Sequence, residues 1–217
     1  MKFDFRLLDV SLELHALDDH YELIEKQLAH LSHVEQKTLA EYCQKEGLTP
    51  DDPEWDLARQ ECDYKIDFLL PRFFYGSFII SLYAVYETSV TEIARLLMKS
   101  KKCEIDINEI RGSFLQRAEK YYNNILNFEL CSDVNTWKRI KELSTLRHSL
   151  AHANGRIDMM KDDVKKGIRE LVKKNVGVST HYNYVIVDVS YAKETLNIVS
   201  SSLGCLVDSY KNYTECS

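Results

Sequence analysis

The sequence predicts an all-α fold, and three observations support that prediction. Seven glycines and three prolines in 217 residues are too few turn-forming residues for a sandwich or barrel of many short strands. Apolar residues recur at helical spacing over most of the chain. Only one stretch, His181 to Ser190, alternates and is β-branched, which indicates a strand. We therefore expect a helical bundle with a small strand or hairpin near the C-terminus.

The first half of the chain predicts two long helical segments. One runs from Phe5 to Gly47, where the glycine ends it. Residues 49–53 indicate a loop, and its closing proline suits the first turn of the next helix. That helix runs from Glu54 to about Lys99, and we expect Pro71 to break or kink it near Leu70. The stretch after Pro71 is the most apolar of the chain and predicts the central buried helix.

The second half predicts shorter elements, which capping residues, stop signals and alternation delimit. We expect a helix that Asp106 or Asn108 caps and that runs to Leu126. The next helix is opened by Ser132-Asp133, runs from Val134 to about Ala153 and stops at Asn154-Gly155. After it we expect, in chain order, a charged helix from Asp158 to Asn175, a hairpin partner over Asn175 to Ser179, the strand, and a last helix from Tyr191 to about Tyr210.

The chain is expected to divide at the first loop, into an N-terminal helical arm (residues 1–52) and a helical domain (residues 53–217). Six scattered cysteines without a C-x-x-C pair predict reduced thiols rather than a disulfide framework or zinc ribbon. The start of the chain lacks a signal-peptide pattern, and no unbroken apolar run has the length of a membrane span, so we expect a cytoplasmic protein with no membrane contact. The net charge of −6 excludes a basic coat protein.

Polar side chains gather where the helix stops at Asn154-Gly155: Arg147, His148, Ser149, His152 and Asn154. On an ideal helix His148 and His152, four residues apart, share one face, whereas Arg147 lies about 140° round from His152. Leucines on the other side of the segment would anchor it. We therefore expect this polar cluster to be held at the end of a rigid element.

The pattern R-x-x-x-x-H, with a histidine directly after the arginine, resembles the signature of HEPN domains. These are helical proteins found in bacterial toxin–antitoxin, abortive-infection and RNA-cleaving defence systems. Arg147, His148 and His152 match the signature, and Glu87 lies in an apolar helix similar to the family's central helix, which bears a glutamate. The order of elements also agrees, and the resemblance covers roughly Pro71 to Tyr210.

The resemblance implies a HEPN-like helical bundle and a metal-independent endoribonuclease without a cofactor. Such cleavage needs a base, an acid and positive charge on the phosphate. Histidine can be either acid or base near neutral pH, and the arginine fork matches two phosphate oxygens. The resemblance further implies a homodimer in which Arg147 and His152 of both copies line one composite cleft. His148 would position the phosphate or orient His152, and Ser149 and Asn154 could add hydrogen bonds.

The same resemblance implies a toxin or phage-defence effector that cleaves RNA and has an antitoxin or another defence-system protein as its partner. Two alternatives stay open from the sequence: a non-catalytic HEPN module that binds RNA or a protein, and a plain helical scaffold assembled through its arm. Glu87 could orient Arg147 or be an internal polar anchor. Five basic residues could flank an RNA cleft or belong to a solvated face interleaved with carboxylates: Lys138, Arg139, Lys141, Lys165 and Lys166.

Overall fold

A computed structural model describes residues 5–131, 133–174 and 177–216. The fold is mostly helical and has one antiparallel hairpin near its C-terminus, as predicted. Its main elements are α1 (Phe5–Glu46), α2 (Pro53–Tyr64), α3 (Leu70–Ser100), α4 (Phe114–Lys120), α5 (Val134–Ala153), α6 (Asp162–Lys173), β1 (Val178–His181), β2 (Tyr184–Val187) and α7 (Val189–Cys216).

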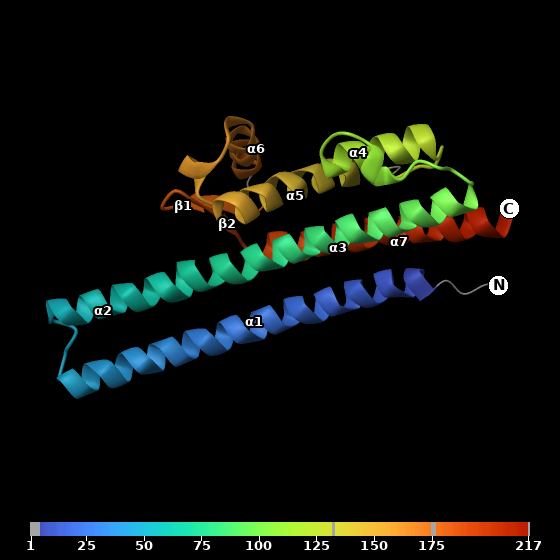
Figure 1. The fold of residues 1–217 in the computed structure, drawn as a ribbon. Coiled ribbons are helices and arrows are strands. Elements are labelled where there is room, and N and C mark those ends of the chain that lie inside the picture. Colours follow the sequence, from blue (N-terminus) through green and yellow to red (C-terminus); the bar gives the residue numbers. More distant parts are fainter. Residues whose placement is uncertain (1–4, 132, 175–176, 217) are drawn as a thin grey trace.

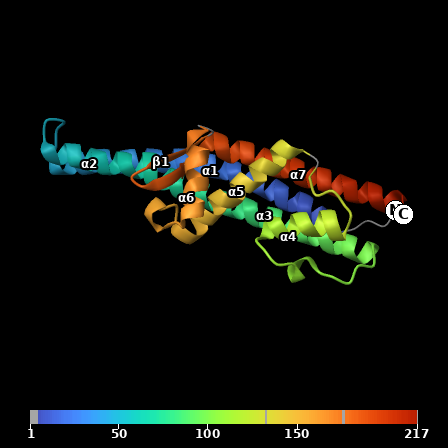
Figure 2. The ribbon, with the colours of Figure 1, turned by 90° about the horizontal axis from the view of Figure 1, so that it is seen from above.

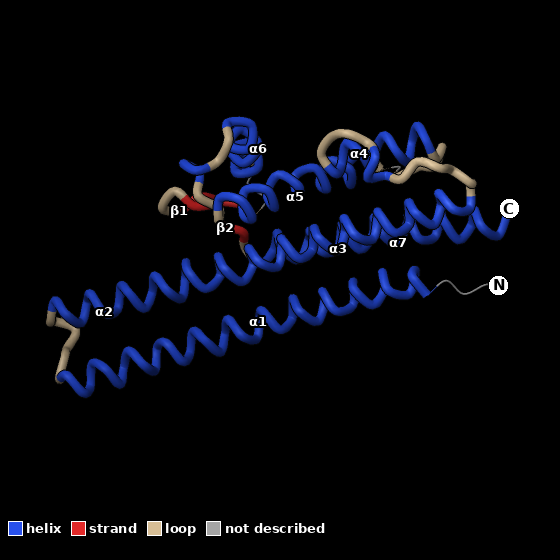
Figure 3. The backbone as a smooth tube through the Cα atoms, viewed as in Figure 1, coloured by secondary structure: helices blue, strands red, loops and turns tan. Residues whose placement is uncertain are grey.

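The molecule is elongated because its longest helices run side by side. Helix α1 runs antiparallel to α2 and α3, and α7 packs beside α3 (Figure 1). Helices α4, α5 and α6 and the hairpin lie on the side of α3 away from α1 (Figure 3). Seen from above, α6 and the hairpin lie near the middle of the molecule's length, and the paired ends of α1 and α2 project beyond them (Figure 2).

The core follows α3, which the sequence predicts as the central helix and which has buried residues along its length, although Phe73 is 52% exposed and Ile80 and Val85 are only half-buried. The first half of α1 belongs to the same core, through four buried residues: Val10, Leu17, Tyr21 and Ile24. Beyond Ile24, Cys43 is the one buried residue of α1 in the described part of the chain. The described part of residues 1–52 is therefore integrated with the bundle over its first half and projects from it over its second half.

Of the break or kink expected near Leu70, the break is wrong, because one continuous helix of 48 residues runs from Pro53 to Ser100. The helix changes type just before the proline, in a π-helical turn over Lys65–Leu69. The N–H of Leu70 donates to the carbonyl of Lys65, five residues back, and α3 then begins with Pro71 in its first turn. A proline is tolerated there because its missing N–H is not needed.

This same helix is long and apolar enough to cross a membrane by length and composition. Its most apolar window is 39% buried inside the fold, and the core helix of a soluble protein passes the same test. It is the one such helix among the described residues, and it is a weak indication of a span.

Two helix starts differ from those predicted. Asp106 caps a short 3-10 turn over Ile107–Glu109, and Ser113 begins α4 with a capping box, so the longer helix expected from Asp106 is wrong. Helix α6 begins at Asp162 rather than Asp158, because a second 3-10 turn precedes it. The predicted helix end at Asn175 and the predicted helix start at Ser132 lie outside the described residues.

The strand within the alternating stretch, β2, is shorter than predicted. Tyr182 and Asn183 have φ angles of 45° and 66°, so they form a two-residue turn of left-handed residues between β1 and β2. The strand expected over His181 to Ser190 is therefore corrected: His181 ends β1, the next two residues form the turn, β2 follows, and the last residues begin α7. Of the expected hairpin partner over Asn175 to Ser179, Val178 and Ser179 pair with β2 as predicted, and residues 175–176 lie outside the described residues.

Candidate active site

Helix α5 carries the polar cluster and begins and ends at the predicted residues. The carboxylate of Asp133 accepts hydrogen bonds from the N–H groups of Asn135 and Thr136. At the other end Asn154 and Gly155 have φ angles of 47° and 73°, and their N–H groups donate to the carbonyl of Ser149. The apolar side of α5 is buried, at Ile140, Leu143, Leu146 and Leu150.

His148 and His152 lie side by side on the exposed edge of α5. Their ring centroids are 4.5 Å apart with an interplanar angle of 52°, which confirms the predicted shared face. Partial burial lowers the pKa of His148 below its ordinary 6.5. Interactions with His152, Arg147 and Lys161 lower this pKa further, whereas the negative charge of Asp163 raises it. His148 is therefore a neutral imidazole near pH 7, able to accept a proton.

Arg147 lies on the same turn of the helix, with its guanidinium carbon 5.6 Å from the centre of the Tyr83 ring. Ser144 donates a hydrogen bond of 3.1 Å to the hydroxyl of Tyr83. Burial and the negative charge of Glu87 raise the pKa of Tyr83, and the positive charges of Arg147 and Arg117 lower it. Glu87 and Arg147 thus act on the same tyrosine, and the described residues show no ion pair between the two.

Ser149 and Asn154 hold the end of α5 rather than extend the exposed edge. Ser149 is fully buried, and its hydroxyl donates to the carbonyl of Leu146 at 2.7 Å. Asn154 has an exposed side chain, but its carbonyl accepts a hydrogen bond from the guanidinium of Arg72. The expectation that Ser149 adds hydrogen bonds to a bound substrate does not fit its burial.

Arg72 is a buried cation that sequence reasoning missed. Its Nη1 donates to the Asn154 carbonyl at 3.3 Å, and its guanidinium lies 4.3 Å from the Tyr184 ring centre and 4.4 Å from that of Phe73. No carboxylate pairs with it among the described residues, and its Nε is buried without a partner. The carbonyl end of α5 and the ring faces therefore stabilise its charge. An arginine directly after Pro71, in the most apolar stretch, was the available signal.

Arg139, predicted to contact RNA, is occupied by contacts inside the fold. Its guanidinium forms ion pairs with Glu142 at 3.3 Å and with Glu194 at 2.7 Å, and it lies 5.2 Å from the Tyr191 ring centre. These contacts join α5 to α7. A phosphate would have to displace two carboxylates, so Arg139 serves packing.

The other predicted basic residues are on the surface. Lys141 lies 4.0 Å from Glu119 and over the ring of Trp137, and Lys165 lies 3.7 Å from Asp162. Lys138 and Lys166 are exposed, and neither forms an ion pair with another described residue. Such surface pairs are weak and exchange readily with solvent, so these four lysines can still contact an anion.

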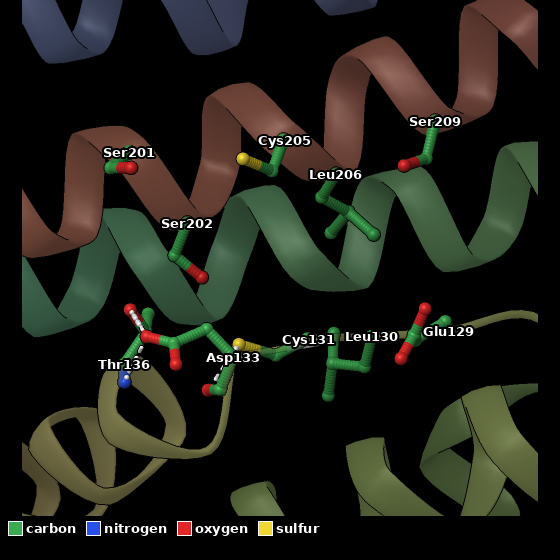
Figure 4. Close-up of a pocket in the computed structure, with 10 residues that line it drawn as sticks. All are labelled: Glu129, Leu130, Cys131, Asp133, Thr136, Ser201, Ser202, Cys205, Leu206 and Ser209. Atoms are coloured by element: carbon green, nitrogen blue, oxygen red, sulfur yellow. Dashed lines mark hydrogen bonds between the residues drawn. The ribbon is translucent and has the colours of Figure 1, made fainter.

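One pocket of the molecule lies elsewhere, at the start of α5. A pocket of about 230 Å³ opens between the loop before α5 and helix α7, with Cys131 and Cys205 facing it (Figure 4). Burial raises the pKa of the Cys131 thiol, which makes it a poor nucleophile. Since Thr136, which lines the pocket, precedes His148 by twelve residues, the pocket lies about 18 Å along α5 from the nearer histidine. It is therefore separate from the histidines.

No family model matches the chain, and neither a curated protein nor a solved structure matches it. The residues described above contain no group of three or more His, Cys, Asp or Glu side chains placed to hold a metal ion.

Proposed function

We propose that the chain is a metal-independent endoribonuclease of HEPN type whose active residues are Arg147, His148 and His152. One observation carries the proposal: two histidine rings lie 4.5 Å apart on an exposed helix edge, and an arginine directly precedes the first of them in the same turn. The positive charges around His148, which lower its pKa, would also attract a phosphate.

The proposed reaction uses the three side chains in distinct roles. A neutral histidine accepts the proton of the ribose 2′-hydroxyl, and the 2′-oxygen attacks the adjacent phosphorus. The other histidine, protonated, donates a proton to the 5′-oxygen as the bond between that oxygen and phosphorus breaks. Arg147 neutralises the charge that gathers on the phosphate oxygens. The products are a 2′,3′-cyclic phosphate and a 5′-hydroxyl. The lowered pKa of His148 suits the base, which leaves His152 as the acid.

Purified protein and a labelled RNA test the proposal directly. We expect cleavage that persists in EDTA and leaves a 2′,3′-cyclic phosphate. The variants His152→Ala and Arg147→Ala should each lower the cleavage rate by at least 100-fold. His30→Ala, which changes an exposed histidine on α1, is the matched control and should cleave normally. Unaltered cleavage by both site variants, or its loss on chelation, would refute the proposal.

The proposal includes a homodimer whose twofold axis joins the two copies of the cluster in one cleft. A second copy would double the positive charge that a single exposed edge can offer. Mixed dimers of Arg147→Ala and His152→Ala subunits keep one arginine and one histidine on opposite chains. We expect them to recover part of the cleavage that each variant lacks alone. Both variants must first elute as dimers on a sizing column, and absence of recovery in confirmed heterodimers would remove the composite site.

A toxin or defence role, with an antitoxin or defence-system protein as partner, follows from the same proposal. We expect induced expression of the wild-type chain to stop the growth of bacterial cells, and expression of His152→Ala to leave growth normal. Equal growth of the two cultures, at equal protein levels, would contradict a toxin role.

A further inference from the structure

Aromatic rings from α2, the π-helical turn and the hairpin meet in one cluster beside the end of α5. Phe68, which is buried, is its centre. Its ring centroid lies within 6 Å of four others, at 4.9, 5.4, 5.8 and 5.9 Å from Tyr64, His181, Tyr182 and Tyr184. Tyr64 and Tyr182 also contact each other, at 5.8 Å. Packing fixes these rings in place, yet three of them reach solvent: Tyr182 is 67% exposed, Tyr64 is 41% exposed and His181 is also exposed.

Tyr182 occupies a position that a smaller residue would fill more easily. It is the first residue of the two-residue turn, with a φ of 45°, where Asn, Asp or Gly is usual and a bulky side chain is rare. Its ring packs against His181, Phe68 and Tyr64, at 4.1, 5.8 and 5.8 Å between centroids, and the residue is still 67% exposed. The neighbouring rings therefore hold an unusual residue for this turn in a fixed place where a ligand can reach it.

The turn that carries Tyr182 is fastened to the segment directly after the catalytic cluster. The Val185 N–H donates to the Gly155 carbonyl at 2.9 Å, and the Ile157 N–H donates to the Asn183 carbonyl at 3.0 Å. Gly155 follows His152 by three residues, and Tyr182 precedes Val185 by three, which is at most about 10 Å of extended chain. A strand with its scissile phosphate at His152 therefore reaches the ring within a few nucleotides.

The charges near the rings favour contact with bases over contact with phosphates. Asp63 and Asp67 are exposed on the helix that carries Tyr64, and Lys65 between them is paired with Glu35 at 2.6 Å. An RNA strand on this side of the molecule thus gains more from stacking its uncharged base faces than from ion pairs.

We infer that Tyr64 and Tyr182 stack on unpaired bases of the RNA, so that the substrate is single-stranded next to the cleaved bond. The identity of this ligand as substrate rests on the proposed endoribonuclease function. Bases in a duplex are already stacked and turn only their edges outward, so a duplex would leave both tyrosines unused.

Binding of a fluorescein-labelled twelve-nucleotide RNA, measured by anisotropy in a His152→Ala background, tests the inference without cleavage. We expect Tyr182→Asn to bind about tenfold more weakly and Tyr182→Phe to bind within twofold of its parent. Asparagine tolerates the left-handed turn, so Tyr182→Asn should keep its melting temperature within about 3 °C. The same RNA annealed to its complement should bind at least tenfold more weakly. The control is Tyr42→Ala, which removes a 46% exposed tyrosine near the far end of α1 and should change nothing.

Three results would overturn the inference: unchanged binding by Tyr182→Asn, equal binding of the duplex, or full binding by Tyr182→Leu. The last would identify the patch as an apolar docking surface for a protein. Cleavage tests the endoribonuclease function and binding tests the stacking surface, so the two proposals can be refuted separately. A wild-type chain that binds single strands through Tyr182 but cuts none refutes the endoribonuclease and leaves the stacking surface standing. A chain that cuts RNA while Tyr182→Asn binds it normally refutes only the stacking surface.

Discussion

The two halves of α5 use the same kind of side chain in opposite ways. In the first half Arg139 lies between two carboxylates and a ring, and it joins α5 to α7. In the second half Arg147, eight residues later, contacts the Tyr83 ring and has no ion pair with a described residue. A cation with two acidic partners stabilises the fold, whereas one without them is available to an anionic ligand. Pairing therefore distinguishes the two arginines of α5: Arg139 is engaged inside the fold, whereas Arg147 is open to the anionic ligand that we propose.

The largest expected effect sets Arg147 against Arg139 in RNA cleavage. We expect Arg147→Gln to lower the initial rate by at least about 100-fold, because the phosphate loses its positive partner in the transition state. Arg139→Gln should stay within about threefold of wild type, because its guanidinium is already engaged. Rates are measured with both proteins at equal concentration, after circular dichroism shows equal helix content. A large loss in Arg139→Gln with little loss in Arg147→Gln would reverse the comparison.

Unfolding by urea should show the opposite order. Arg139→Met leaves the mostly buried carboxylate of Glu142 with only the Lys174 ion pair, and it separates α5 from Glu194. We expect the free energy of unfolding to fall by about 1–3 kcal/mol. Lys138→Met, at the neighbouring exposed position, is the control and should change it by less than about 0.5 kcal/mol. Equal effects at the two positions would mean that the ion pairs of Arg139 add nothing measurable.

A smaller effect is expected where α6 packs against the middle of α5. A methyl group added at Gly167 would lie 2.7 Å from the Cγ2 of Thr145. We expect Gly167→Ala to lower the stability by about 1–2 kcal/mol, because one helix must move away from the other. Thr145→Ser removes that Cγ2, so the double variant should recover most of the loss in thermal unfolding. Additive losses in the double variant would rule out this contact as the cause.

The smallest effect concerns pH. Because the pKa of folded His148 lies below its ordinary value of 6.5, the unfolded chain binds more protons as the pH falls through 6.5. His148 should therefore lower the stability slightly below that pH and have no effect above it. An NMR titration of the His148 ring should give a midpoint under 6.5, and Lys161→Gln should raise it by removing one positive charge. A midpoint above 6.5 would contradict the cationic surroundings of the site.

Local signals were enough to predict α5 and its cluster. The cap at Asp133 and the stop at Asn154-Gly155 act on their own neighbours, so their residue types alone define the helix ends. The histidine pair follows from four-residue spacing. The burial of Ser149, the pairing of Arg139 and the buried Arg72 depend on partners far away in the sequence, which a single helix pattern does not contain. The π-helical turn before Pro71 is of the same kind, because its surroundings decide how the chain accommodates a proline.

The π-helical turn over Lys65–Leu69 is a place where the long helix can change its length by one residue. Deletion of one residue there would restore an uninterrupted α-helix and leave the core face of α3 unchanged. The wider turn accommodates one extra residue, so the flanks on either side of it would keep nearly their present orientation after that deletion. A deletion elsewhere in the helix would instead rotate everything on its N-terminal side by about 100° and take Tyr64 out of the ring cluster. The turn is thus a position where related chains can lose one residue and keep the ring cluster in place.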